Sequence, residues 1–222
     1  TNAPSSDACV QLAKSRPGVH ASVGIQPNYT HEAAPGDWDR VVALADSPEV
    51  VALGETGLDR YWDDAPWEVQ QDYFDRHIRL AQQREIALIL HMRDCGQELV
   101  EMLRDARRRG PLIGIMHSFT GDAELASECL ELGLHVSFAG MVTFKKSDAL
   151  RACAATIPAD RLLVETDAPY LSPEPLRGKR PNEPARVVHT AKALARVRGV
   201  SLENLAAQTT SNARTIFRLA TR

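Results

Sequence analysis

Residues 50–91 read VVALGETGLDRYWDDAPWEVQQDYFDRHIRLAQQREIALILH and contain one complete strand–helix–strand unit. Two apolar runs, Val50–Glu55 and Ile86–His91, flank Trp67–Arg84, where apolar side chains recur at helical spacing. Runs that are apolar throughout are typical of parallel strands, because other elements cover both of their faces. This stretch therefore predicts a parallel α/β structure.

The same alternation continues on both sides of this unit. Further strands are expected at Val19–Ile25, Leu112–His117, Leu134–Phe138 and Leu162–Asp167. Further helices are expected at Gln97–Arg109, Ala123–Leu132, Ser147–Ala155, Pro184–Arg198 and Leu202–Leu219. No linker, low-complexity stretch or tandem repeat interrupts the pattern, so we expect one domain over residues 1–222.

Composition and charge indicate a globular chain. Of its 222 residues 44% are hydrophobic, and 26 Lys and Arg against 29 Asp and Glu give a net charge of −3. This balance excludes a histone-like polycation, so any contact with nucleic acid must be local. No apolar run approaches the roughly 20 residues that cross a bilayer, and the first residues do not resemble a signal peptide. We therefore expect a cytoplasmic protein with no membrane partner.

Four of the six expected strands end in a possible metal ligand. The carboxyl ends of parallel barrel strands meet at one face, so these side chains should converge. Two imidazoles and two carboxylates suit a divalent ion such as zinc or manganese. Taken singly, a strand-end His is more often structural, and a strand-end Asp is often an N-cap. Clustered carboxylates would repel one another without a cation, so the set as a whole favours a metal site. Its members are Glu55, His91, His117 and Asp167.

The other histidines lack this placement. His77 and His189 fall inside expected helices and His135 begins a strand, so we expect packing or surface roles for them. Glu165 lies two residues before Asp167 and points to the same side of the strand. We expect it to support the ligands or to belong to the barrel core.

Six short motifs resemble those of the TatD-type metal-dependent deoxyribonucleases of the amidohydrolase superfamily. They occur in the family's order and spacing, and the resemblance covers nearly all 222 residues. The motifs are VGIQP at 23–27, GETGLD at 54–59, HMRD at 91–94, HSFTG at 117–121, VETDAP at 164–169 and RPNEP at 180–184. By this resemblance Glu55 bridges two ions, His91 and His117 complete the second ion site, and Asp167 binds metal and orients or deprotonates the attacking water.

The sequence departs from the family pattern at two places. The family begins with a strand ending in His-x-His, and no such segment precedes Thr1. Such a barrel has eight strand–helix units and takes about 250 residues, whereas this sequence offers six units in 222 residues. The resemblance therefore implies a TIM-type (β/α)8 barrel lacking its first two strand–helix units in this chain. Gln26 stands where the family commonly has His, and an amide cannot carry a proton or a charge at neutral pH.

Candidate substrate contacts lie on the same expected face. Arg93 can bind a phosphate in bidentate fashion, and Arg180 can add positive charge from the proline-rich loop Ala168–Pro184, although either can be a solvated surface charge. Gln26 is a further candidate contact. Loop aromatics, among them Phe119, can stack on unpaired bases or simply cover the core. The other loop aromatics of this kind are Tyr61, Trp62 and Tyr170.

The resemblance implies a hydrolase that cuts phosphodiester bonds, as a 3′–5′ exonuclease on DNA ends or single strands. It would use two divalent ions, drawn from Mg, Mn and Zn, and needs no obligate protein partner. Two alternatives stay open. One is a metal-dependent hydrolase of another ester or an amide, and the other is a barrel fragment that binds or scaffolds with impaired catalysis. The sequence leaves open the choice between DNA and RNA.

Overall fold

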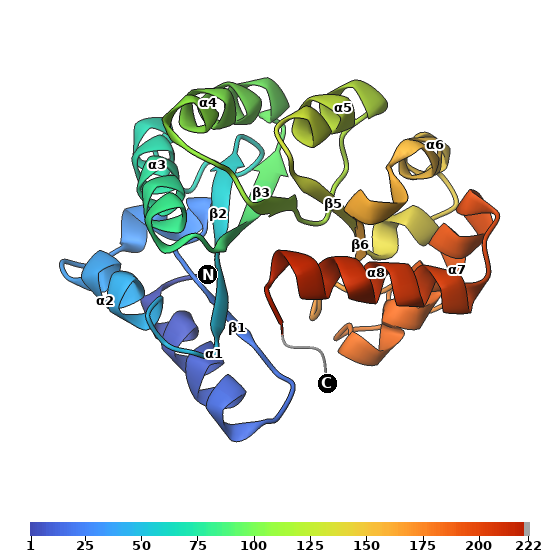
Figure 1. Cartoon of the computed structure of the whole chain (residues 1–222), viewed down its shortest axis with the longest axis horizontal. Helices are drawn as coiled ribbons and strands as arrows, with labels where there is room; N and C mark the ends of the chain where they lie inside the picture. The colour runs from blue at the N-terminus through green and yellow to red at the C-terminus, as the bar shows by residue number, and fades with distance from the viewer. Residues whose placement is uncertain (220–222) are drawn as a thin grey trace. The chain divides into compact units, whose positions relative to one another are not determined.

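The computed structural model describes residues 1–219, within which six strands form one sheet (Figure 1). The strands follow one another across the sheet in the order β1-β2-β3-β4-β5-β6. The pairings β1–β2, β2–β3 and β5–β6 are parallel. The predicted parallel α/β structure is therefore confirmed. The strand bounds are Ala21–Val23 (β1), Val50–Asp59 (β2), Ala87–Arg93 (β3), Gly114–Met116 (β4), His135–Phe138 (β5) and Leu162–Val164 (β6).

Helices separate the strands along the chain, and α1 and α2 were not expected from the sequence. The α-helices are Ala3–Ser15 (α1), Asp37–Leu44 (α2), Trp67–Arg84 (α3), Gly96–Arg109 (α4), Ala123–Glu131 (α5), Asp148–Thr156 (α6), Val187–Arg198 (α7) and Leu202–Ile216 (α8). Four short 3-10 helices lie at Pro27–Glu32 (η1), Gly140–Thr143 (η2), Ala159–Arg161 (η3) and Pro184–Arg186 (η4). No helix of the described residues combines the length and the hydropathy that a membrane crossing requires.

The chain divides into two compact units, Thr1–Ile115 and Met116–Arg222. In the first unit α1 packs on β1, α3 packs on β2 and β3, and α4 packs on β3. The core between these elements is aliphatic and aromatic. Its fully buried side chains include Leu53, Leu58, Phe74, Ile78, Leu88, Leu90, Leu99 and Leu103. The single domain expected over residues 1–222 stays a prediction.

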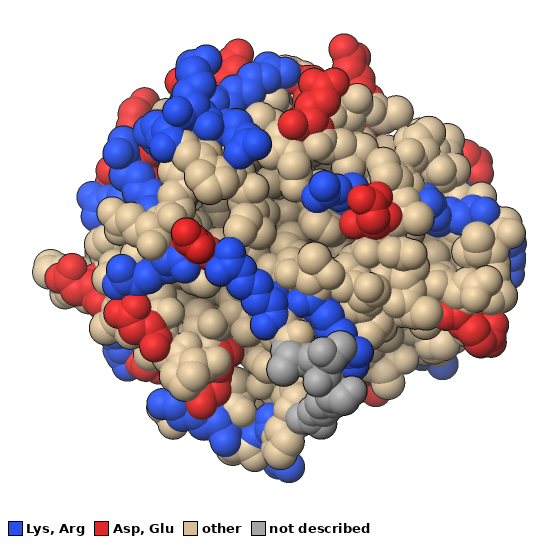
Figure 2. Space-filling model, in the orientation of Figure 1, with Lys and Arg blue, Asp and Glu red and all other residues tan. Residues whose placement is uncertain are grey.

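The outer surface of α3 and α4 carries charges of both signs (Figure 2). Arg76 pairs with Asp72 at 2.6 Å along α3, and Arg109 of α4 pairs with Asp75 of α3 at 2.6 Å. Several of the arginines of these helices are therefore paired with acids and do not form a uniformly basic face.

In the second unit α5 packs on β5, while α7 and α8 pack on β6. Asn212 of α8 is buried and donates from Nδ2 to the carbonyl oxygens of Ala159 and Leu162, both at 2.8 Å. Because these bonds join α8 to the start of β6, the last helix is fixed to the sheet by polar as well as apolar contacts.

The strand ends differ from the sequence-based expectation, and β2 differs most. It was expected to end at Glu55 and instead continues to Asp59, because Gly57 pairs with His91 and Asp59 pairs with Arg93 of β3. By contrast β6 ends at Val164, so Asp167 lies in the following loop. Asp167 has a φ of 55°, in the left-handed region that a strand does not use.

Candidate metal centre

One histidine of the first unit lies between two carboxylates. His91, near the end of β3, has Nδ1 3.1 Å from Glu55 Oε1 and Nε2 2.7 Å from Asp59 Oδ2. The His91 and Glu55 side chains are 18% and 23% exposed, whereas that of Asp59 is 1% exposed. The buried carboxylate therefore lies behind the imidazole, and the partly exposed one lies where a ligand can reach it.

Asp59 is a residue that the strand-end reasoning missed. Its Oδ1 accepts the backbone N–H groups of Tyr61 at 2.8 Å and Trp62 at 3.0 Å, and its Oδ2 also accepts from Asn28 Nδ2 at 3.1 Å. Burial raises the pKa of Asp59, but the hydrogen bonds from His91, Trp62 and Asn28 outweigh it and lower the pKa below its usual value. Asp59 is therefore held as a carboxylate that orients His91.

This arrangement fits a metal ion. A neutral imidazole has one N–H and can donate to only one of its two carboxylates at a time. When the proton is on Nε2, next to Asp59, the lone pair on Nδ1 faces a Glu55 oxygen only 3.1 Å away. That contact is repulsive unless a second proton or a cation lies beside the two atoms. A ligand histidine whose other ring nitrogen donates to a carboxylate is the usual arrangement at protein metal sites.

The second unit contains a similar pair. His117 follows β4 directly, and its Nδ1 lies 3.1 Å from Glu165 Oε1. The same oxygen accepts the backbone N–H of Ser118 at 2.7 Å. A carboxylate at Nδ1 favours the tautomer with the proton there, so Nε2 has the lone pair that a metal requires. The contact agrees with the expectation that Glu165 supports a ligand.

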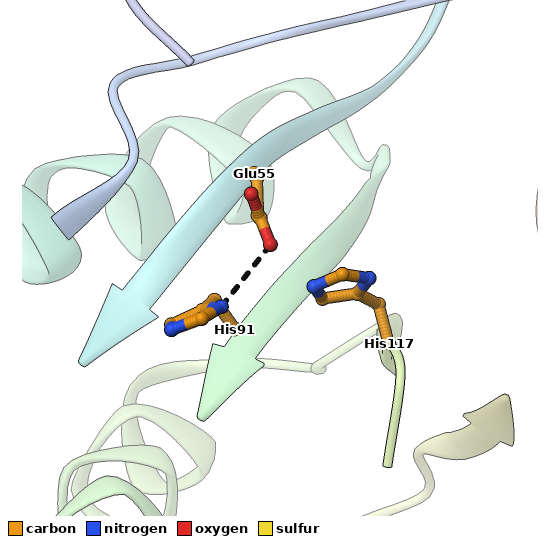
Figure 3. A group of neighbouring side chains, drawn as sticks. All are labelled: Glu55, His91 and His117. Carbon is orange, nitrogen blue, oxygen red and sulfur yellow. Dashed lines mark hydrogen bonds and ion pairs between the residues drawn. The ribbon is translucent and has the colours of Figure 1, made fainter. Parts of the chain in front are cut away.

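Glu55, His91 and His117 each offer one ligand atom, and these three atoms lie within 4.8 Å of one another (Figure 3). Two of the side chains come from β2 and β3, and the third directly follows β4. The group contains three of the four strand-end residues singled out in the sequence. Two imidazoles and a carboxylate are a donor set suited to zinc and similar divalent ions.

Asp167 belongs to the second unit and is partly exposed in the loop after β6. The proline-rich segment Ala168–Pro184 follows it and is fixed by a buried amide: Asn182 is 3% exposed and donates from Nδ2 to the carbonyl oxygens of Thr166 at 2.8 Å and Tyr170 at 2.6 Å. The long proline-rich segment is therefore tied to the residues on either side of Asp167.

The expected substrate contacts have different surroundings. Arg93 and Arg180 are exposed, which leaves both predictions open. Gln26 is buried, and its Oε1 accepts the backbone N–H of Asn28 at 2.9 Å, so it caps η1. Phe119 was expected in a loop, as a stacking side chain or as a cover of the core. It is 1% exposed and packs edge-on against Phe138 with ring centroids 6.1 Å apart, which favours the core alternative over base stacking.

The chain matches the family described as TatD related DNase over residues 1–218. A protein of Bacillus subtilis strain 168 named uncharacterized metal-dependent hydrolase YabD is 38% identical over 201 residues, which are 90% of this chain and 78% of YabD. The 3′-5′ ssDNA/RNA exonuclease TatD of Salmonella typhimurium is 35% identical over 221 residues, which cover 98% of this chain and 85% of that protein.

Comparison with solved structures agrees with the family match. The crystal structure of YJJV, a TatD homologue from Escherichia coli K12, matches with a TM-score of 0.91 and 26% identity, covering 99% of this chain and 85% of that one. The expected TIM-type barrel fold is thereby confirmed. The family match covers almost the whole chain, the relatives are more than one-third identical, and the site offers a donor set for a divalent ion. The chain therefore belongs to the TatD family of metal-dependent hydrolases.

Proposed function

We propose that this chain is a metal-dependent phosphodiesterase that shortens single-stranded nucleic acid, DNA above all, from its 3′ end. The observation that carries the proposal is the group of Glu55, His91 and His117, with a carboxylate behind each histidine. The name of the Salmonella relative, a 3′-5′ ssDNA/RNA exonuclease, supports this choice of substrate.

In the proposed reaction the residues have distinct roles. Glu55, His91 and His117 would hold a divalent ion, and Glu55 and Asp167 would supply ligands to a second one. Bound divalent ions lower the pKa of water and offset the charge that develops on the phosphoryl oxygens. Asp167 accepts the proton of the attacking water, while Asp59 and Glu165 keep the two imidazoles in the ligand tautomer.

Arg93 and Arg180 are the proposed phosphate contacts. Both are exposed, and a guanidinium presents planar N–H donors that match two phosphate oxygens. Other esters and amides are the second candidate class, because the same donor set also activates water against a carbonyl carbon. In the hydrolysis assay below, cleavage of nucleic acid favours the first class, whereas intact strands at full metal occupancy leave the second.

The test begins with protein stripped by a chelator and reloaded with Mg, Mn or Zn separately. Single-stranded DNA and RNA of one sequence, labelled at either end, are then incubated with each form. Loss of nucleotides from the 3′ end, restored by metal and abolished by chelator, is expected. Asp167→Asn should lower kcat by about 100-fold or more, because a positioned base contributes 10²- to 10⁴-fold.

Asp160→Asn is the matched control, since the Asp160 side chain is 72% exposed and belongs to the same unit. It should retain wild-type kcat. Full metal occupancy, measured by elemental analysis, with both strands left intact would contradict the proposed function.

A further inference from the structure

Two aromatic rings from the segment after β2 and a guanidinium at the end of β3 form an exposed cluster. Tyr61 is 53% exposed and Trp62 is 51% exposed, and their rings meet edge to face with centroids 4.9 Å apart. The guanidinium carbon of Arg93 lies 3.6 Å from the Tyr61 ring centroid and 5.9 Å from that of Trp62. We call Tyr61, Trp62 and Arg93 the aromatic–arginine cluster.

Hydrogen bonds fix this cluster beside the proposed ligands of the first unit. Asp59 Oδ1 accepts the backbone N–H groups of Tyr61 at 2.8 Å and Trp62 at 3.0 Å, while Asp59 Oδ2 accepts from His91 at 2.7 Å. Arg93 is the last residue of β3, two positions after His91, so the two side chains leave the strand on the same side. One carboxylate thus positions both the imidazole and the cluster.

The composition of the cluster fits a particular kind of ligand. Large aromatic rings with half of their surface in water offer flat faces, and every nucleobase has a π-face that can stack on them. Within the described part of the chain Arg93 forms no ion pair, so its charge is available to an anion. Tyr61 supports one face of the guanidinium, which leaves the N–H donors in the plane of the group.

We propose that Tyr61, Trp62 and Arg93 form a subsite that stacks one unpaired base of a nucleic-acid strand and binds an adjacent phosphate. This inference rests on the proposed function and adds a reason for a single-stranded substrate. Bases paired inside a duplex have both faces covered by their neighbours, so only an unpaired or terminal base can occupy the subsite.

The experiment measures binding, separately from hydrolysis, with chelator-treated protein. Fluorescence anisotropy gives the Kd for a labelled eight-nucleotide oligothymidylate and for a strand of equal length in which every base is missing. The two strands share their phosphates and differ only in the groups that stack. Wild-type protein should bind the oligothymidylate about 10-fold more tightly.

Trp62→Leu and Trp62→Phe are the matched pair of variants, since only Phe keeps an aromatic face. Trp62→Leu should weaken oligothymidylate binding about 10-fold and leave the abasic strand unchanged, whereas Trp62→Phe should retain most of the affinity. Asp59 bonds to the backbone of residue 62, so both variants keep that hydrogen bond and should show wild-type metal content after reloading. Arg93→Gln should weaken both strands alike and lower the slope of log K against log salt by about 0.7.

Three results would overturn the subsite: no binding of either strand by wild-type protein, equal loss on both strands in Trp62→Leu, or unchanged affinity in that variant. The hydrolysis assay separates this failure from that of the proposed function. Base-dependent binding without metal-dependent cleavage would leave the subsite standing and reject the nuclease. Metal-dependent cleavage together with unchanged affinity of Trp62→Leu for the oligothymidylate would support the nuclease and reject the subsite.

Discussion

At the scale of single residues, Asp59 decides how His91 can act. Its Oδ2 lies 2.7 Å from His91 Nε2 and its side chain is 1% exposed, so no water can replace it as acceptor. Asp59→Asn puts an amide in place of a full negative charge and weakens the preference for a proton on Nε2. We expect metal affinity to fall between 10- and 100-fold, the usual cost of removing such a supporting carboxylate.

Isothermal titration of stripped protein with zinc measures this change. Asp72→Asn is the control, because the Asp72 side chain is 53% exposed and pairs with Arg76 along α3. If Asp59→Asn binds zinc as tightly as wild-type protein and the Asp72 variant, Asp59 does not position His91 for metal.

Sequence reasoning found the histidines of the site but not the carboxylate that orients one of them. The sequence was enough to identify Glu55, His91 and His117, because each closes or directly follows a run of apolar residues. Asp59 also stands in the sequence, two alternations beyond Glu55 on the same side of β2. It was missed because the strand was expected to end at Glu55, and only the pairing with β3 shows that the strand continues to Asp59.

At the scale of elements, β2 and β3 approach each other so closely at Gly57 that no other residue fits there. A Cβ at this position would lie 2.1 Å from the carbonyl oxygen of His91, and Gly57 has a φ of 134°. Gly57→Ala must therefore push β3 away from β2 at the residue that carries the imidazole. We expect it to lower the free energy of unfolding by about 3 kcal/mol or more and to weaken zinc binding.

Denaturant unfolding and zinc titration together test this expectation. Gly178→Ala is the control for backbone conformation, because Gly178 also has a positive φ, of 85°, but a Cβ there meets no atom within 4 Å. It should cost about 1 kcal/mol and leave zinc binding unchanged. Equal losses in the two variants would show that close approach is not what Gly57 provides.

The elements themselves were predictable where periodicity was strong. All six strands appear at the expected places, and Trp67–Arg84 is a helix with the expected bounds. The N-terminal helices α1 and α2 were missed, since α1 is rich in small and polar side chains and α2 buries only Val41 among its eight residues. Strand ends were the least predictable feature, because they depend on pairing between segments distant in the chain.

At the scale of the whole molecule, stability toward acid should depend on a histidine outside the metal centre. His77 of α3 is fully buried; its Nε2 accepts the backbone N–H of Ile25 at 3.0 Å, and its Nδ1 lies 2.6 Å from the carbonyl oxygen of Tyr73. The ring also meets Trp38 with centroids 4.8 Å apart. Since Ile25 follows β1, this one imidazole joins α3 to the first strand, and it can do so only while Nε2 carries no proton.

Burial lowers the pKa of His77 from 6.5 to about 4. Between these values the unfolded chain binds a proton that the folded chain does not, so the free energy of unfolding falls as the pH falls. The stabilisation that neutral His77 provides is complete above pH 6.5, is lost by about pH 4 and does not change further below that. It amounts to roughly 3 kcal/mol of the free energy of unfolding.

Urea unfolding of metal-free protein at several pH values measures this loss of stability. His77→Gln should be less stable near neutrality and lose about 3 kcal/mol less than wild-type protein between pH 6.5 and 4, whereas His20→Asn, at an exposed position, should follow the wild-type curve. A His77→Gln curve parallel to that of wild-type protein would mean that some other group sets the acid limit of this fold.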